Sequence, residues 1–183
     1  MSDPVSALGH AVFEGFAKVR EIGPLGMISL RATTDVPGLA SAVRGVTGTD
    51  LPTLRQIVVN SDRAAGWMGP DEYLLVLPYT EVGAALTGLT AALQGQHHLA
   101  VDVSDARAAF RIEGDKADQV LRKLSPVDFD RLAEGELRRT RLAQVAAAFW
   151  RDGDGFTLVC FRSVAEYAMG VLSQAAAIGS ELV

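Results

Sequence analysis

Few side chains in this 183-residue chain are of a type that could carry chemistry by itself, and the single thiol is the first candidate. Cys160 is the only cysteine, so the sequence allows no internal disulfide and no cysteine-rich metal site. It lies in the apolar run 156–161, where a cysteine usually behaves as a small hydrophobic residue. We therefore expect Cys160 to be buried and not to act as a nucleophile.

Two histidines and two carboxylates are the other candidates for acid–base or metal chemistry. His97 and His98 precede a run that contains Asp102, and Asp71 and Glu72 are adjacent. Adjacent residues of a strand point to opposite faces, so neither pair is expected to converge on one substrate or ion. We expect exposed or edge histidines and solvated or salt-bridged carboxylates, with no catalytic and no metal-binding residue in this chain.

Known nucleotide-binding and zinc-binding motifs are missing. There is no Gly-x-Gly-x-x-Gly after a strand, no phosphate loop with its Lys and Ser/Thr, and no zinc-type His/Cys spacing. These absences argue against a cofactor held by this chain.

The nearest approach to a basic patch is formed by Arg138, Arg139 and Arg141. Carboxylates of a neighbouring subunit or the glutamate tail of a folate could bind there. Glu134 and Glu136 lie close by in sequence, which favours a solvated face of mixed sign. The net charge of −5 and the lack of a dense Lys/Arg run also argue against nucleic acid as a partner.

The composition is that of a folded globular protein, with 49% hydrophobic and 21% charged residues. The apolar runs 73–77 and 145–150 are far shorter than the roughly 20 residues that span a bilayer. Residues 1–15 include acidic side chains and lack the basic start and apolar stretch of a secretion signal. We therefore expect a cytoplasmic protein without membrane contact.

The first half of the chain has alternating and helical patterns that predict the order βαββαβ. Strands are expected over 27–33, 54–60, 72–77 and 99–103, with a loop through 61–69 between the second and third. Asp35 is the expected N-cap of the first helix, with Gly45 or Gly48 as its stop, and Thr80 the expected cap of the second.

The second half repeats much of this order. Strands are expected over 108–112, 142–150 and 156–161, with a helix capped by Asp115 and a last helix opened by a Ser163–Glu166 capping box. Residues 67–76 also match 150–159 in character. The prediction is a single domain, 1–183, with an internal pseudo-repeat of roughly 25–104 and 106–178.

Two such halves define the expected fold class. We predict an α+β protein made of two duplicated ferredoxin-like, or split βαβ, halves, each with helices on one face of an antiparallel sheet.

Three ordered groups of residues resemble the gamma subunit family of heterotetrameric sarcosine oxidase. They span residues 66–177, whereas residues 1–55 match only in general character. The groups are 66–75; then 101–107, 112–117, 120–123 and 126–129; and finally 139–142, 155–158 and 161–167. Ser125 departs from the family pattern, which often has a cysteine at this point, but no role is attributed to that position.

This resemblance implies a complex that oxidatively demethylates sarcosine to glycine, with tetrahydrofolate as the acceptor of the one-carbon unit. The implied partners are the alpha, beta and delta subunits, of which the larger ones hold FAD, FMN and NAD. The gamma chain itself is implied to be non-catalytic and structural. Its implied fold is that of the folate-binding domain of the glycine cleavage T-protein.

Five residues of the family-like stretches are expected at an interface or as fold signatures: Trp67, Pro70, Asp71, Arg107 and Arg162. Trp67 could stack on a flavin or pterin, but an aromatic residue before Gly-Pro-Asp-Glu more often anchors a turn or fills a subunit contact. The two arginines flank strands and could pin a turn or reach a partner.

Two other functions stay open at this point. The duplicated order also fits a free-standing folate-binding or aminomethyltransferase-like module, which would need a concave pocket with a convergent carboxylate. A stand-alone small-molecule sensor that pairs with itself through a sheet edge is the third reading.

Overall fold

The computed structural model describes residues 4–182 and divides the chain into two compact units. The central unit is Leu25–Ser104, and the terminal unit combines Met1–Pro24 with Asp105–Val183. Each unit has its own antiparallel sheet and its own hydrophobic core. The N-terminal segment therefore folds with the second half of the chain.

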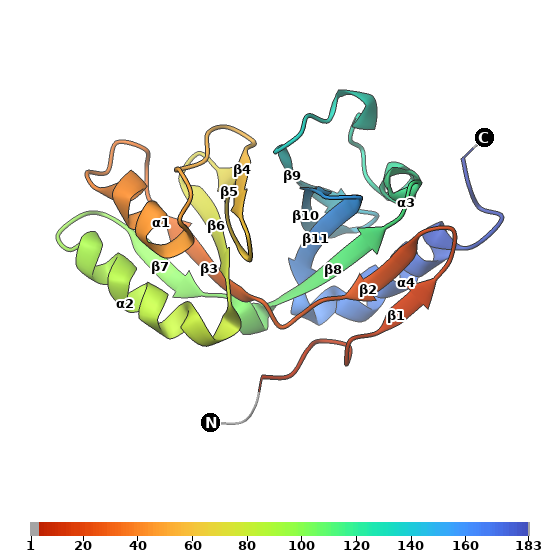
Figure 1. Ribbon diagram of the computed structural model, residues 1–183, viewed down its shortest axis with the longest axis horizontal. Coiled ribbons are helices and arrows are strands. Elements are labelled where there is room, and N and C mark those ends of the chain that lie inside the picture. The colour runs from red at the N-terminus through yellow and green to blue at the C-terminus, as the bar shows by residue number, and fades with distance from the viewer. Residues whose placement is uncertain (1–3, 183) are drawn as a thin grey trace. The chain divides into compact units, whose positions relative to one another are not determined.

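The central unit has a five-stranded sheet in the order β4-β5-β6-β3-β7, in which all neighbouring strands are antiparallel. Helices α1 and α2 lie next to each other on one face of this sheet (Figure 1). The bounds are β3 Gly26–Arg31, α1 Leu39–Thr47, β4 Ile57–Asn60, β5 Arg63–Gly69, β6 Glu72–Leu77, η1 Tyr79–Glu81, α2 Val82–Ala92 and β7 Leu99–Asp102.

Alternation along the strands decides which side chains form the core of the central unit. Leu30 on β3 and Leu75 on β6 are fully buried beneath the helices, and Val43 of α1 and Leu89 of α2 meet them. Burying side chains of this kind contributes about 1.5–3 kcal/mol each, so this contact holds the helices on the sheet.

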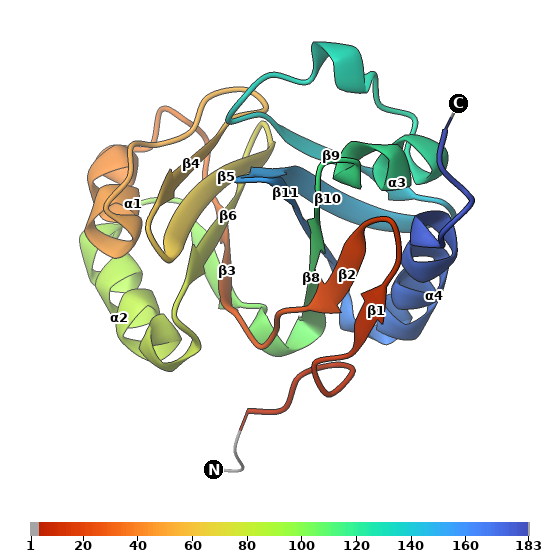
Figure 2. The ribbon, with the colours of Figure 1, turned by 45° about the vertical axis from the view of Figure 1, so that its right-hand side comes forward.

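The terminal unit has a six-stranded sheet in the order β1-β2-β8-β11-β10-β9, also antiparallel throughout. Helices α3 and α4 pack together on one side of it (Figure 2). The bounds are β1 Val12–Glu14, β2 Lys18–Glu21, η2 Ser104–Ala106, β8 Arg107–Glu113, α3 Ala117–Leu124, η3 Phe129–Arg131, β9 Leu137–Leu142, β10 Val145–Asp152, β11 Gly155–Phe161, η4 Arg162–Val164 and α4 Ala165–Ala176.

An aromatic cluster fills the core of the terminal unit. Phe129 stacks on Phe149 with ring centroids 5.6 Å apart, and Phe156 meets both rings edge to face. Beside this cluster, Gly155 brings β11 against β8 so closely that a Cβ atom would lie 1.9 Å from the Ile112 carbonyl oxygen. Only glycine fits at this position.

The two units place corresponding elements in the same order. In the central unit the sheet runs β5-β6-β3-β7, and in the terminal unit it runs β10-β11-β8-β2, with β4 and β9 as additional outer strands. In the central unit the last position is filled by β7, which follows α2 in the chain. In the terminal unit it is filled by β2, which precedes the central unit in the chain. The expected α+β class with antiparallel sheets is confirmed, with four α-helices among residues 4–182. The pseudo-repeat itself stays a prediction.

Two strand predictions were wrong. Residues 61–69, expected as a loop, contain the whole of strand β5, because Gly66 and its small neighbours pair with both β4 and β6. Residues 142–150 were expected as one strand, but strand β9 includes the basic stretch 138–141 and ends at Leu142. A tight turn, in which Ala143 has a φ of 50°, then leads into β10.

The predicted helix caps were also wrong. α1 begins after Gly38 rather than after Asp35, although Gly48 does end it in the left-handed conformation. A 3-10 turn precedes both α2 and α4, so Thr80 and Ser163 lie inside these turns and cap neither α-helix through their side chains. Lys116, not Asp115, is the N-cap residue of α3.

No helix in the described part of the chain is both long enough and apolar enough to cross a membrane.

Candidate functional site

Three of the five expected signature residues lie in the β5–β6 hairpin of the central unit. Trp67 is half-buried on β5 and packs against the core beneath the helices. A β-bulge between Trp67 and Gly69 breaks the register with β6, and Pro70 and Asp71 form the exposed turn that follows. Trp67 therefore anchors one strand of this hairpin to the core of the central unit.

Arg31 at the end of β3 binds both carboxylates of this turn. Its guanidinium lies 3.5 Å from a carboxylate oxygen of Asp71 and 3.6 Å from one of Glu72. The expectation that these carboxylates diverge was wrong, because Asp71 lies in the turn and only Glu72 lies on the strand. The expectation that they are salt-bridged is confirmed.

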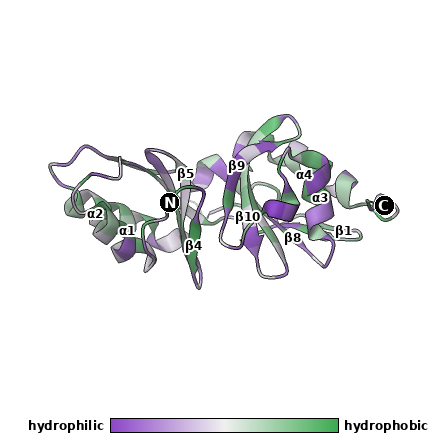
Figure 3. Ribbon diagram, turned by 90° about the horizontal axis from the view of Figure 1, so that it is seen from above, coloured by the Kyte–Doolittle hydropathy of each residue, from purple (hydrophilic) through white to green (hydrophobic). Residues whose placement is uncertain are grey.

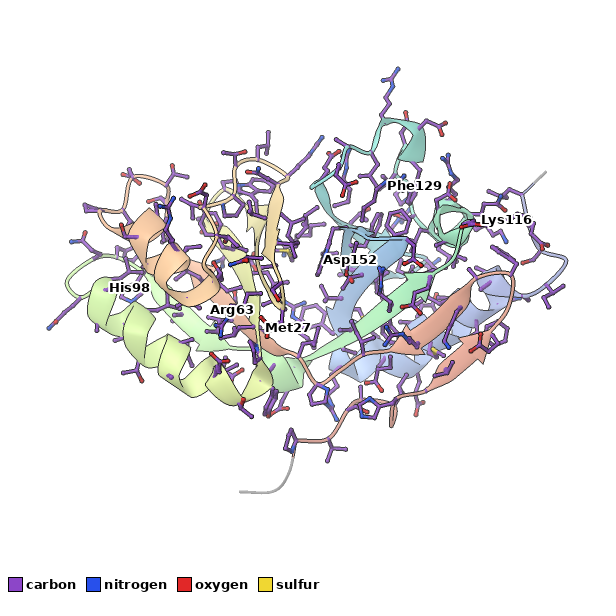
Figure 4. The ribbon with its side chains drawn as sticks, in the orientation of Figure 1. Met27, Arg63, His98, Lys116, Phe129 and Asp152 are labelled. Atoms are coloured by element: carbon purple, nitrogen blue, oxygen red, sulfur yellow. The ribbon has the colours of Figure 1, made fainter. Side chains whose placement is uncertain are left out.

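A shallow hollow of about 330 Å³ lies beside this ion pair. Arg31, Asp71, His97, His98 and Leu99 line it together with two small residues. His98, labelled in Figure 4, has its ring Nδ1 atom 3.0 Å from the carbonyl oxygen of Gln96. The histidines thus lie at the start of the edge strand β7, as expected.

Arg107 on β8 lies over the ring of Phe161, the residue directly opposite on β11. Its guanidinium carbon is 4.3 Å from the ring centroid, which is the geometry of a cation–π pair. Phe161 is 46% exposed, which is unusual for a phenylalanine, so this pair presents an aromatic surface to solvent.

Arg162 holds the N-terminal segment. Its Nη2 atom donates to the carbonyl oxygens of Val5 and Ser6 at 2.9 and 3.0 Å, across more than 150 residues of sequence. The buried carboxylate of Glu21 holds the same segment from the other direction, because it accepts the backbone N–H groups of Ala7, Leu8 and His10 at 2.6–3.0 Å. Arg162 and Glu21 therefore hold residues 5–10 on the terminal unit.

An ionic cluster centred on Arg111 of β8 was not expected from the sequence. Its guanidinium donates to the carbonyl oxygen of Asp152, which is labelled in Figure 4, and to the carboxylate of Asp154 at 3.1 Å. Arg111 is buried, and its Nη1 atom has no hydrogen-bond partner among residues 4–182. The sequence did offer one signal for this cluster, because Arg111 is a charged residue within the otherwise apolar strand 108–112.

Glu113 extends this cluster to strand β2. Arg20 binds the Glu113 carboxylate with Nε and Nη2 at 2.8–3.2 Å. These hydrogen bonds, more than the added positive charges of Arg20 and Arg111, hold the pKa of Glu113 below its ordinary value. The cluster therefore ties β2 to β8 as an ionised pair.

Cys160 lies in the core of the terminal unit, fully buried, which confirms the expectation. Burial raises the pKa of its thiol to about 11, so little thiolate exists at neutral pH. Among residues 4–182, no three His, Cys, Asp or Glu side chains lie close enough together to hold a metal ion.

A second hollow, also of about 330 Å³, lies between α1 and α2. Small residues line most of it, and the ion pair between Arg63 and Glu81 closes part of its wall. Arg63, labelled in Figure 4, donates to the Glu81 carboxylate at 2.5 Å and to the Val46 carbonyl at 3.0 Å. This carboxylate is thus already occupied by a cation.

Comparison with known proteins adds sequence relatives to this geometry. A family described as the sarcosine oxidase, gamma subunit family matches residues 31–178. The "Sarcosine oxidase subunit gamma" of an Arthrobacter species is 34% identical over 157 residues, covering 81% of this chain and 73% of that protein. The protein of the same name from Corynebacterium sp. strain P-1 is 33% identical over 153 residues, with the same coverage.

Two solved structures have a similar fold. A chain of the heterotetrameric sarcosine oxidase from Corynebacterium sp. U-96 superposes with a TM-score of 0.80 at 28% identity, covering 90% of this chain and 87% of that chain. The glycine cleavage system aminomethyltransferase T from Bartonella henselae superposes with a TM-score of 0.67 at 15% identity, covering 91% of this chain and 48% of that one. The second match shows the likeness of fold alone.

Proposed function

The chain belongs to the sarcosine oxidase gamma subunit family, and from this premise we propose that it is a non-catalytic assembly subunit of a cytoplasmic heterotetrameric sarcosine oxidase. The observation that carries the proposal is the match to a chain of such a complex. That match extends over nine tenths of this chain and most of the other, with a TM-score of 0.80. A whole subunit, rather than one shared motif, is therefore similar.

The local chemistry of the chain supports a structural role. Arg162 and Glu21 hold the N-terminal segment, and Arg111 with Glu113 ties strands together. The one thiol is buried with a raised pKa. These groups stabilise the fold of the chain, and none of them faces a hollow described above.

The proposed reaction belongs to the whole complex. It is the oxidative demethylation of sarcosine to glycine, with tetrahydrofolate as the one-carbon acceptor, and the larger of the alpha, beta and delta partner subunits hold the FAD, FMN and NAD. In this proposal the gamma chain contributes surface. Trp67, Pro70 and Asp71 shape one hairpin of that surface, and Arg107 with the exposed Phe161 forms another part of it.

The proposal also treats residues 25–104 and 106–178 as two copies of one ancestral unit. The shared strand order and the matching positions of the helices support this reading. The likeness to an aminomethyltransferase fold does not require the same activity.

The alternative of a free-standing folate-binding module draws on the likeness to the aminomethyltransferase fold. A pterin needs a convergent free carboxylate in a pocket, and the hollow between α1 and α2 does not supply one, because Glu81 is bound to Arg63. Titration of the isolated chain with a reduced folate tests this alternative. Saturable binding would favour it, and the assembly proposal predicts none.

Co-expression tests the proposal itself. The alpha, beta and delta subunits are produced with and without this chain, and sarcosine-dependent turnover and the yield of assembled enzyme are measured. We expect the isolated chain to be inactive and its omission to lower the yield of assembled enzyme. An unchanged, fully active enzyme without this chain would contradict the proposal.

A further inference from the structure

The edge strand β7 of the central unit exposes apolar side chains. Leu99 is 55% exposed and Val101 is 41% exposed. Both lie on the sheet face away from α1 and α2, because Ala100 between them packs against the core beneath the helices. Such exposure on a short edge strand is uncommon, because an open edge invites pairing with another chain.

The backbone of β7 is arranged to accept a further strand. The N–H of Val103 donates to the Met27 carbonyl at 2.9 Å. Val101 and Leu99 lie two and four residues before Val103 and pair with Ser29 and Arg31 of β3, so they face β3 in the same way. In an antiparallel ladder the residues between them turn their N–H and C=O groups outward. Ala100 and Asp102 therefore present unpaired backbone groups at an edge that pairs with no other described strand.

Apart from its short length and the charge of Asp102, β7 lacks the usual devices that block an edge. The strand has the sequence Leu-Ala-Val-Asp, without lysine, proline or a bulge. Asp102 is the one charged residue of the strand, and its carboxylate is hydrogen-bonded within the chain. It accepts the backbone N–H and the hydroxyl of Ser104 at 2.9 and 2.6 Å. Asp102 is itself exposed, but Leu99 and Val101 are the exposed β7 side chains on the sheet face away from the helices, and an uncharged apolar partner complements that face.

The terminal unit shows what covers the same edge when it is closed. Strand β2 holds the place there that β7 holds in the central unit, because β2 pairs with β8 as β7 pairs with β3. The outer side of β2 is covered by β1, which pairs with it antiparallel from Val12 opposite Arg20 to Glu14 opposite Lys18. The fold therefore already accommodates one short added strand at this position.

We propose that an extended, uncharged apolar segment of another subunit of the complex adds to β7 as an antiparallel strand, as β1 adds to β2. This inference rests on the proposed function, because it needs a partner subunit. The segment bonds to the outward backbone groups of Ala100 and Asp102 and covers Leu99 and Val101. The hollow beside Leu99 lies at the end of this strand and accommodates a side chain of the partner.

Val101→Lys and Leu99→Lys test the proposal, with Val59→Lys as the matched control. Val59 is 51% exposed on β4, the opposite edge strand of the same sheet, which is coloured as hydrophobic over most of its length (Figure 3). The wild type and these three variants are each tagged and used to capture the co-expressed partner subunits. We expect capture to fall about tenfold or more for each β7 variant and to stay unchanged for the control.

Hydrogen exchange separates strand addition from a simple side-chain contact. In the isolated chain the amides of Ala100 and Asp102 should exchange fast, and in the complex they should slow about tenfold or more. Two results would overturn this inference but leave the proposed function standing. In the first, the wild type and both folded β7 variants capture the partner subunits equally well. In the second, the amides of Ala100 and Asp102 stay unprotected in the complex. Loss of a homodimer in these variants would instead assign the edge to a second copy. Failure of the wild type to capture any subunit removes the proposed function as well.

Discussion

Glu21→Ala should lower the free energy of unfolding by about 2–4 kcal/mol, although Glu21 lies in no proposed interface. The carboxylate is 3% exposed and accepts three backbone N–H groups at 2.6, 3.0 and 2.9 Å. A hydrogen bond to a charged group contributes about 1.5–3 kcal/mol, which gives about 4.5–9 kcal/mol for three. The three share one carboxylate, and the freed N–H groups can turn to water, so about half of that sum is expected.

Urea unfolding followed by circular dichroism measures this change, and limited proteolysis reports release of residues 4–11. Glu21→Gln keeps an acceptor and should lose less than Glu21→Ala. Glu14→Ala is the matched control, because Glu14 is 67% exposed and pairs only with Lys18, so its change should stay within about 0.5 kcal/mol. The reasoning is refuted if Glu21→Ala is as mild as Glu14→Ala and the segment stays protected.

Three further predictions concern single side chains. Tyr73→Phe should raise the free energy of unfolding by about 1 kcal/mol in the same urea assay, because the buried Tyr73 hydroxyl has no hydrogen-bond partner among the described residues; a loss of stability would contradict this. Arg20 lowers the pKa of Glu113 in the folded state, so the ionised Glu113 contributes to the free energy of unfolding above the unfolded pKa of about 4.3, and this contribution is lost as the pH falls through the lower folded pKa. Glu113→Gln should therefore flatten the decline of stability below about pH 4. An unchanged slope in acid titrations would count against the Arg20–Glu113 pair. Cys160, with a thiol pKa of about 11, should react with a thiol reagent at pH 8 only after the chain unfolds in urea, so fast labelling of the native chain would show that it is accessible.

Local patterns predicted the elements that bury an apolar face. Strands β3 and β6 and helix α2 lie where alternation and helical spacing indicated, because each presents its apolar side chains to the core within a short stretch. Gly48 was predicted as a helix stop for a local reason too, its tolerance of the left-handed conformation. Signals of this kind are complete within about ten residues of sequence.

Elements that depend on distant partners could not be predicted in this way. Strand β2 pairs with β8, where Arg20 binds Glu113 across 93 residues, and no local pattern indicates that the start of the chain folds with its second half. Strand β5 looks like a loop because of its glycines, and only its two neighbours in the sheet make it a strand. Sheet pairing overrides weak strand propensity at such positions.

The same distinction holds for the candidate functional residues. Arg107 and Arg162 were chosen from their positions beside strands, but their partners, Phe161 and the carbonyls of Val5 and Ser6, became visible only in the structure. The Arg111 cluster was missed because the carboxylates that surround it come from a hairpin about 40 residues away in sequence.

Membership of the assembled oxidase is tested by a pull-down of the tagged chain from cells that also express the alpha, beta and delta subunits, followed by a flavin absorbance scan of the eluate. We expect a yellow eluate that contains the larger subunits in fixed proportion to this chain. A colourless eluate that contains this chain alone would contradict that membership.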